Sequence, residues 1–280
     1  MITTAKPTAQ TRPHRHPSDT MAHPKPSLQF NEAPYGRESL ASMILHLRTH
    51  GWVRLPNVFV RDSVDGFLEE ALQHVQHDPE RNSYKLNPEL SHNHYAALAP
   101  RIRQVLPHVF SNEISFPSVS IFETPWLISE GGQKEIKESY WHKDRARECQ
   151  NIERYTLPSD IHVSIYYRDT WEEGSGATAI VPFSHRDASR NPSDGKSEIL
   201  TFQGNKEGVF LWDQRCFHSG TTRTLDGLRL NHIIGFHAVP AYGYLRDMPL
   251  SLRNEWLDSE SIDDQIYFGG KWSRKSVLLE

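Results

Sequence analysis

The second half of the chain consists of short strand-like segments, and this feature constrains the fold most. From about residue 114 onwards, runs of alternating, β-branched or aromatic residues recur, and glycine or proline separates most of them. These segments are Ser115–Glu123, Ile161–Tyr167, Ala177–Val181, Val209–Asp213 and Leu228–Val239. Following a helical lead-in, they predict one α+β domain, mainly β, whose core is a sandwich or jelly roll.

The lead-in predicts a helix followed by a strand. Met43, Ile44 and Leu47 recur at helical spacing, and Gly51 follows them as a helix stop. Trp52–Leu55 alternates apolar and polar residues, as a half-buried strand does.

A second helix is expected after a cap at Asp62 or Ser63. Its apolar residues form one stripe, which we interpret as core rather than as a binding surface. The stripe consists of Val64, Phe67, Leu68, Leu72 and Val75. Both helices are therefore expected to pack on the outside of the β core.

Residues 1–27 differ in composition from the rest of the chain. They are rich in proline, threonine and serine and have no periodic apolar pattern. We predict a disordered tail over 1–27 and a single domain over 28–280. The basic character of the tail leaves organelle targeting open, although its prolines disfavour the amphipathic helix of a targeting peptide.

The overall composition restricts the partners. The formal net charge is −4, which argues against nucleic acid as the main partner. No apolar run approaches the roughly 18 residues that a membrane span needs. Cys149 and Cys216 are the only cysteines, so a disulfide scaffold is excluded and a reducing compartment is favoured. We expect a cytoplasmic protein that binds a small molecule; its oligomeric state stays open.

The 16 histidines justify a search for a metal site, and the strongest signal is Trp141-His142-Lys143-Asp144. On an extended segment, His142 and Asp144 point to the same face and can bind one metal. A second histidine would complete a site for divalent iron and leave three positions open for cosubstrate and oxygen. His218, just beyond a predicted strand, is the candidate third ligand.

Other histidine motifs compete with this interpretation. His185-Arg186-Asp187 repeats the His-x-Asp pattern, but it follows Pro182 and is interpreted as a turn after a strand. His92 and His94 resemble a cupin-type pair, but no carboxylate follows them closely. Cys216-x-His218 could be half of a zinc site, although no second pair of that kind is present.

Arg229 is the candidate anion-binding residue. It stands at the start of the last predicted strand, where its planar guanidinium can hold a carboxylate through two hydrogen bonds. Arg223 is the rival, but it lies in a predicted turn where a solvated role is favoured.

These motifs, in this order and spacing, resemble the phytanoyl-CoA dioxygenase family over about residues 38 to 245. The resemblance rests on His142-x-Asp144, on the segment Gly176–His185, and on Leu211-Trp212-Asp213 followed by His218 and Arg229. The segment Thr49–Pro56 also resembles the first strand of that family.

The resemblance implies a double-stranded β-helix in which His142, Asp144 and His218 hold Fe(II). It also implies 2-oxoglutarate as cosubstrate, with its distal carboxylate paired to Arg229, and molecular oxygen as oxidant. The implied function is a dioxygenase that oxidises an unactivated C–H bond of a small organic molecule, in secondary metabolism. Hydroxylation is the default outcome, with desaturation or ring formation as variants.

Two departures from the family pattern stand out. Phe183 occupies a position where members usually have glycine, and no basic residue precedes the iron motif near 122–126. A second contact to the cosubstrate is therefore unassigned. Two alternatives remain: a non-catalytic β-helix protein that binds a ligand, and a cupin-type metal isomerase or hydrolase that needs no keto acid.

Overall fold

The computed structural model describes residues 28–79, 83–86, 96, 99–110, 119–123, 126–132, 140–144, 158, 160–187 and 189–238. The predicted tail over 1–27 lies outside the described residues, as do His92, His94 and Cys149. None of the helices in the described ranges is long and apolar enough to cross a membrane.

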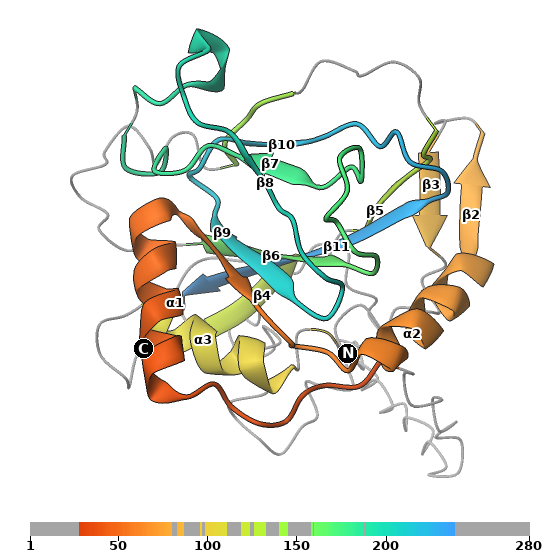
Figure 1. The fold of residues 1–280 in the computed structure, drawn as a ribbon, viewed down its shortest axis with the longest axis horizontal. Coiled ribbons are helices and arrows are strands. Elements are labelled where there is room, and N and C mark those ends of the chain that lie inside the picture. Colours follow the sequence, from red (N-terminus) through yellow and green to blue (C-terminus); the bar gives the residue numbers. More distant parts are fainter. Residues whose placement is uncertain are drawn as a thin grey trace, which may run out of the picture.

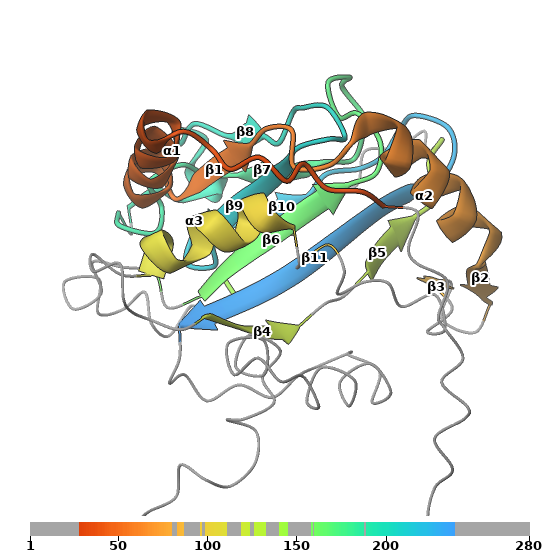
Figure 2. The same ribbon diagram turned by 90° about the horizontal axis from the view of Figure 1, so that it is seen from below.

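A six-stranded antiparallel sheet forms the centre of the molecule (Figure 2). Its strand order is β1-β9-β6-β11-β4, and β5 pairs with the other end of the long strand β11. The strands are β1 (Trp52–Leu55), β4 (Val119–Glu123), β5 (Trp126–Ser129), β6 (Asp160–Tyr166), β9 (Val209–Asp213) and β11 (Arg229–Ala238). Within the described residues, β4, β6, β9 and β11 thus correspond to predicted strands of the second half, and they pair in an order that differs from their order along the chain.

A smaller sheet faces the first one (Figure 1). It consists of β10 (His218–Gly220), β7 (Thr178–Ile180) and β8 (Leu200–Thr201), in that order. One buried cluster joins the two sheets, because its residues come from β6 and β9 of the large sheet and from β7 of the small one. The cluster consists of Tyr166, Ala177, Ile180, Phe202, Phe210, Trp212 and Cys216. Two antiparallel sheets packed face to face confirm the predicted mainly β fold.

The helices cover the outer face of the large sheet (Figure 2). They are α1 (Arg37–His50), α2 (Arg61–Gln73) and α3 (Pro100–Phe110). Alternate strand residues such as Val53, Ile161 and Val163 share a second buried cluster with residues of these helices. The N-terminal helices therefore lie outside the β core, as predicted. A separate hairpin, β2 (Val75–Asp78) with β3 (Ser83–Leu86), follows α2.

The end of α1 agrees with the sequence prediction, but the start of α2 differs from it. Gly51 ends α1 in a left-handed conformation with φ of 84°. Helix α2 begins at Arg61 behind Val60, so neither Asp62 nor Ser63 is its cap. The Ser63 hydroxyl instead donates to Val60 O at 2.7 Å and accepts a hydrogen bond from Gln29 N at 2.9 Å. Its role is to hold the incoming chain against the helix.

Candidate metal centre

His142, Asp144 and His218 come together at one point between the sheets. One ligand atom from each side chain lies within 4.8 Å of the other two, and no other such cluster occurs among the described residues. His142 Nε2 is 3.5 Å from Asp144 Oδ1, and His218 Nε2 is 3.3 Å from Asp144 Oδ2. The three predicted ligands therefore form one site.

Backbone hydrogen bonds bring the two parts of the site together. His142 N donates to His218 O at 3.1 Å, and His218 N donates to His142 O at 3.0 Å. Asp144 N donates to Gln214 O at 3.2 Å, in the turn between β9 and β10. The segment that carries His142 and Asp144 is thus fixed to the strand and turn that carry His218.

The Nδ1 contacts of His142 and His218 determine that Nε2 of each imidazole faces the site. His142 Nδ1 lies 3.1 Å from Tyr140 O, and His218 Nδ1 lies 3.1 Å from Cys216 O. A carbonyl oxygen can only accept, so the Nδ1 proton donates to it and the Nε2 lone pair is left for a metal.

Asp144 carries its negative charge in this setting. Burial alone would raise the pKa of Asp144, but in the metal-free site a hydrogen bond from protonated His218 and the charges of protonated His218, His162 and His142 together lower it; a bound metal would take the place of the Nε2 protons of His142 and His218. Two ligand atoms that lie about 2.1 Å from a metal at a right angle to each other are roughly 3 Å apart. The observed separations of 3.3 and 3.5 Å, each to a different oxygen of Asp144, are close to this value, so the three side chains are near enough to bind one divalent metal.

His162 is a fourth histidine at the site that sequence reasoning missed. It lies on β6, and its Nδ1 is 3.4 Å from Asp144 Oδ2. Its side chain is 7% exposed. The only available signal was its alternation with Ser164 and Tyr166 on one face of a predicted strand, which does not single out a histidine.

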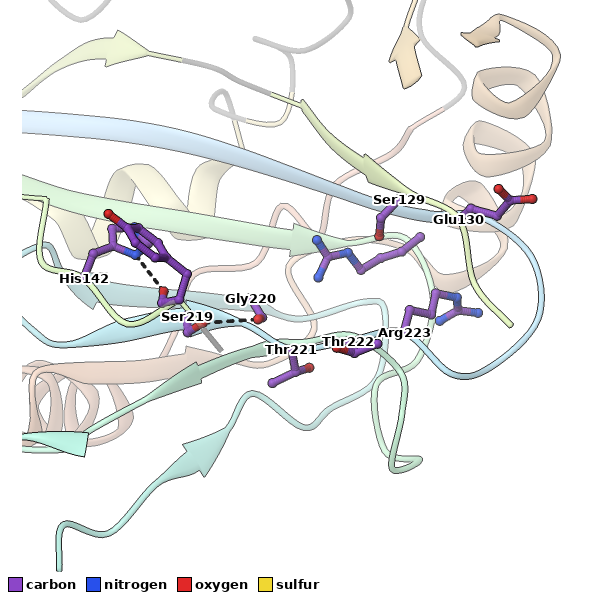
Figure 3. A pocket seen from close by; sticks show the side chains of 10 residues that line it. Ser129, Glu130, His142, Ser219, Gly220, Thr221, Thr222 and Arg223 are labelled. Carbon is purple, nitrogen blue, oxygen red and sulfur yellow. Dashed lines mark hydrogen bonds between the residues drawn. The ribbon is translucent and has the colours of Figure 1, made fainter. Parts of the chain in front are cut away.

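A cleft of about 340 Å³ opens beside the metal centre (Figure 3). His142 lies at one end of the labelled side chains, and Glu130 and Arg223 lie at the other. The cleft is lined by Ser129, Glu130, Tyr140, His142, Ser219, Gly220, Thr221, Thr222, Arg223 and Arg229.

Arg229 lines this cleft from the start of β11. Its guanidinium donates to Gly176 O, and its Nε is buried without a hydrogen-bond partner. Among the described residues, no carboxylate lies within ion-pair distance of it, and burial lowers its pKa. A partly buried cation without a nearby carboxylate is suited to an anionic ligand.

Arg223 is not solvated, contrary to the prediction from its position in a turn. Only 7% of the surface of Arg223 is exposed. Its guanidinium donates to Gly227 O at 3.0 Å, Ser175 O at 2.8 Å and Asp226 O at 2.9 Å. The prediction failed because three carbonyls of neighbouring loops converge on the side chain, which sequence alone does not reveal. Arg223 therefore holds these loops together.

Two of the competing motifs, His185-Arg186-Asp187 and Cys216-x-His218, form no metal cluster of their own among the described residues. His185 lies in a turn, as predicted, with its buried ring Nε2 3.2 Å from Arg48 O. Asp187 accepts hydrogen bonds from Ser189 at the surface. Cys216 is fully buried, and burial raises the pKa of its thiol.

Phe183, where the resembled family usually has glycine, adopts a glycine-like backbone. Its φ is 65°, in the left-handed region that β-carbon contacts disfavour. Its ring packs 4.6 Å from the His50 ring, and Arg190 Cζ lies 4.7 Å from its centroid. The loop thus keeps a glycine conformation while an aromatic side chain covers it.

Comparisons with known proteins identify the fold. No family model matches the chain, and no curated protein matches it in sequence. The epimerase SnoN, in complex with Fe3+, alpha ketoglutarate and nogalamycin RO, is similar in structure, with a TM-score of 0.56 and 17% identity over 75% of this chain and 87% of that one. The alpha ketoglutarate dependent carbocyclase SnoK from nogalamycin biosynthesis has a TM-score of 0.54 and 17% identity over 79% and 93% of the two chains. EctD from S. alaskensis has a TM-score of 0.54 and 16% identity over 79% and 86%. The fold is therefore the predicted double-stranded β-helix.

Proposed function

We propose that the protein is an Fe(II)- and 2-oxoglutarate-dependent dioxygenase that oxidises an unactivated C–H bond of a small organic molecule. The observation that carries this proposal is the pairing of two features in one cleft. His142 belongs to a set of two imidazoles and one carboxylate suited to divalent iron, and Arg229 is a partly buried cation without a carboxylate partner among the described residues.

In this proposal His142, Asp144 and His218 hold the iron, and Arg229 binds the distal carboxylate of 2-oxoglutarate. Iron, the keto acid and oxygen supply the oxidising chemistry when bound. The side chains determine geometry: Tyr140 O and Cys216 O fix the two imidazoles, as their contacts with the Nδ1 atoms indicate. The apolar cluster between the sheets keeps water away from the inner side of the site.

The similar structures support this proposal at the level of chemistry. SnoN is described with iron and alpha ketoglutarate bound, and SnoK depends on alpha ketoglutarate. One is an epimerase and the other a carbocyclase, so one fold serves several outcomes. We assign hydroxylation as the default outcome, with desaturation or ring formation as variants. We propose membership of the phytanoyl-CoA dioxygenase family from the motif order of the sequence, and a role in secondary metabolism because the chain lacks strong acyl-CoA features.

Arg229 also separates this function from its alternatives. A metal isomerase or hydrolase that needs no keto acid does not account for a cation without a carboxylate partner, among the described residues, in the cleft beside the metal centre. A non-catalytic binding protein leaves the convergence of His142, Asp144 and His218 unexplained.

An anaerobic titration tests the proposal. Fe(II) and 2-oxoglutarate should together give a weak absorption band at about 500 nm, typical of an iron–keto-acid chelate. The Asp144→Ala variant serves as the control and should give no band. Metal binding without the band would favour an isomerase or hydrolase, and no metal binding would favour the non-catalytic alternative.

A further inference from the structure

We propose that His162 is a positioning residue that holds one carboxylate oxygen of Asp144, so that Asp144 binds the metal in one fixed orientation. The proposal rests on the metal centre of the proposed function. It assigns a role to a residue that is not one of the three ligands.

The position of His162 on β6 directs its ring into the site. Register pairs His162 with Trp212 of β9 and Gly235 of β11, while its neighbours Ile161 and Val163 belong to the helix-covered outer core. Side chains alternate along a strand, so His162 projects from the inner face. The metal centre lies on that side of the sheet, because Asp144 approaches from the segment paired with β10.

Three imidazoles surround the Asp144 carboxylate, and His162 differs from the other two. His142 and His218 present Nε2 and direct Nδ1 to backbone carbonyls. His162 presents Nδ1, which lies 3.4 Å from Asp144 Oδ2. It stands outside the group of three whose ligand atoms are all within 4.8 Å of one another. The imidazole of His162 therefore acts on the carboxylate and not as a fourth member of the ligand set.

Trp212 packs against both His162 and His218 and holds their imidazoles in place. Its ring centroid is 5.1 Å from that of His162 and 5.6 Å from that of His218. Trp212 is 1% exposed, so it cannot move without disturbing the core between the sheets. The two imidazoles that approach Asp144 Oδ2 thus pack on the same rigid indole.

The consequence is a carboxylate that is restrained before any metal arrives. A carboxylate held at one oxygen is restrained in one orientation, which favours binding through a single oxygen and leaves three of six coordination positions open. Residues that orient a metal ligand in this way typically change metal affinity by about 10- to 100-fold when they are removed.

Three substitutions at position 162 test the proposal. His162→Leu removes the ring nitrogens, His162→Asn places an amide nitrogen near the Nδ1 position, and His162→Gln places one near the Nε2 position. Co²⁺ binding to the protein without 2-oxoglutarate is measured by calorimetry and by the visible Co²⁺ spectrum. We expect about 10- to 100-fold weaker binding and an altered spectrum for Leu and Gln, with recovery for Asn.

His185→Leu is the matched control, because His185 is also buried but contacts Arg48 O away from the site. It should keep the parent's affinity and spectrum. If the His162→Leu variant does not fold, the Co²⁺ affinities of the His162→Asn and His162→Gln variants are compared instead. The proposal is overturned if the His162→Leu variant binds Co²⁺ with the parent's affinity. It is also overturned if the His162→Asn variant binds Co²⁺ no more tightly than the His162→Gln variant. This measurement needs no keto acid, so its failure is distinct from the absence of the chelate band.

Discussion

Replacement of Arg229 by methionine should strongly weaken the binding of 2-oxoglutarate without loss of the metal. Methionine keeps much of the side-chain volume but removes the charge. A bound carboxylate would then lie in the cleft without its partner, which costs up to about 3–5 kcal/mol. At about 1.4 kcal/mol per factor of ten, the affinity should fall by up to about 100- to 4,000-fold. Metal affinity should be retained, because Arg229 is not in the ligand cluster.

The same substitution should not lower the stability of the ligand-free protein. Arg229 is partly buried, its Nε is fully buried, and it has no carboxylate partner among the described residues; replacement of such a charge by an apolar group of similar size is often neutral or stabilising. Thermal unfolding should therefore give a melting temperature at or above that of the parent. Loss of affinity together with retained stability would identify Arg229 as a ligand-binding residue.

The assay is the anaerobic titration of 2-oxoglutarate into the Fe(II) protein, followed at about 500 nm. Arg229→Lys should recover only part of the affinity, since an ammonium cannot form the two parallel hydrogen bonds of a guanidinium. The control is Arg61→Met, because Arg61 forms exposed ion pairs with Asp169 and Glu207. Arg223 is unsuitable as a control, since its loss would leave three loop carbonyls without a donor. The reasoning would be refuted if the Arg229→Met variant were half-saturated at the same 2-oxoglutarate concentration as the parent. A parallel loss of metal affinity would also refute it.

Three further predictions concern other parts of the molecule. Asp144→Ala should abolish Co²⁺ binding in calorimetry while Asp187→Ala leaves it unchanged, and equal losses would mean that the metal pair is misassigned. Phe183→Gly should be about 1 kcal/mol more stable than Phe183→Ala in urea unfolding, because only glycine adopts a positive φ without strain; the opposite order would contradict a left-handed backbone at this position. Burial raises the pKa of Tyr35 from 10.0 to about 12. The contribution of the protonated Tyr35 hydroxyl to the free energy of unfolding is therefore complete below about pH 10 and is lost towards pH 12. The stability difference between the parent and Tyr35→Phe should therefore shrink over that range, and a constant difference would count against the shift.

The strands and the end of the first helix were predictable because their signals are local. Ile161–Tyr167 and Val209–Asp213 combine β-branched or aromatic residues with nearby turn residues, and both are strands to within one residue. Gly51 ends α1 because the left-handed conformation there suits glycine. Helix α3 was not predicted, and Pro107 inside it obscures the helical pattern of its apolar residues.

The metal ligands were predictable from spacing and order, whereas their surroundings were not. His142 and Asp144 lie close in sequence, and His218 follows a strand that could be recognised. The contact of His162 with Asp144 depends on how two distant segments pack across the sheets. The burial of Arg223 likewise depends on loops that converge only in the folded chain.

The strand order of the large sheet also has a consequence for folding. Strand β1 pairs with β9, and Trp52 faces Trp212 from more than half the chain away. Contacts of such large sequence separation form slowly, because a long loop must close before they are made. During synthesis the apolar faces of α1, β1 and α2 emerge well before the strands that cover them. The chain is therefore expected to expose aggregation-prone apolar surface until residue 213 has been synthesised. At that stage it should depend on chaperones more than a domain with local strand pairing does.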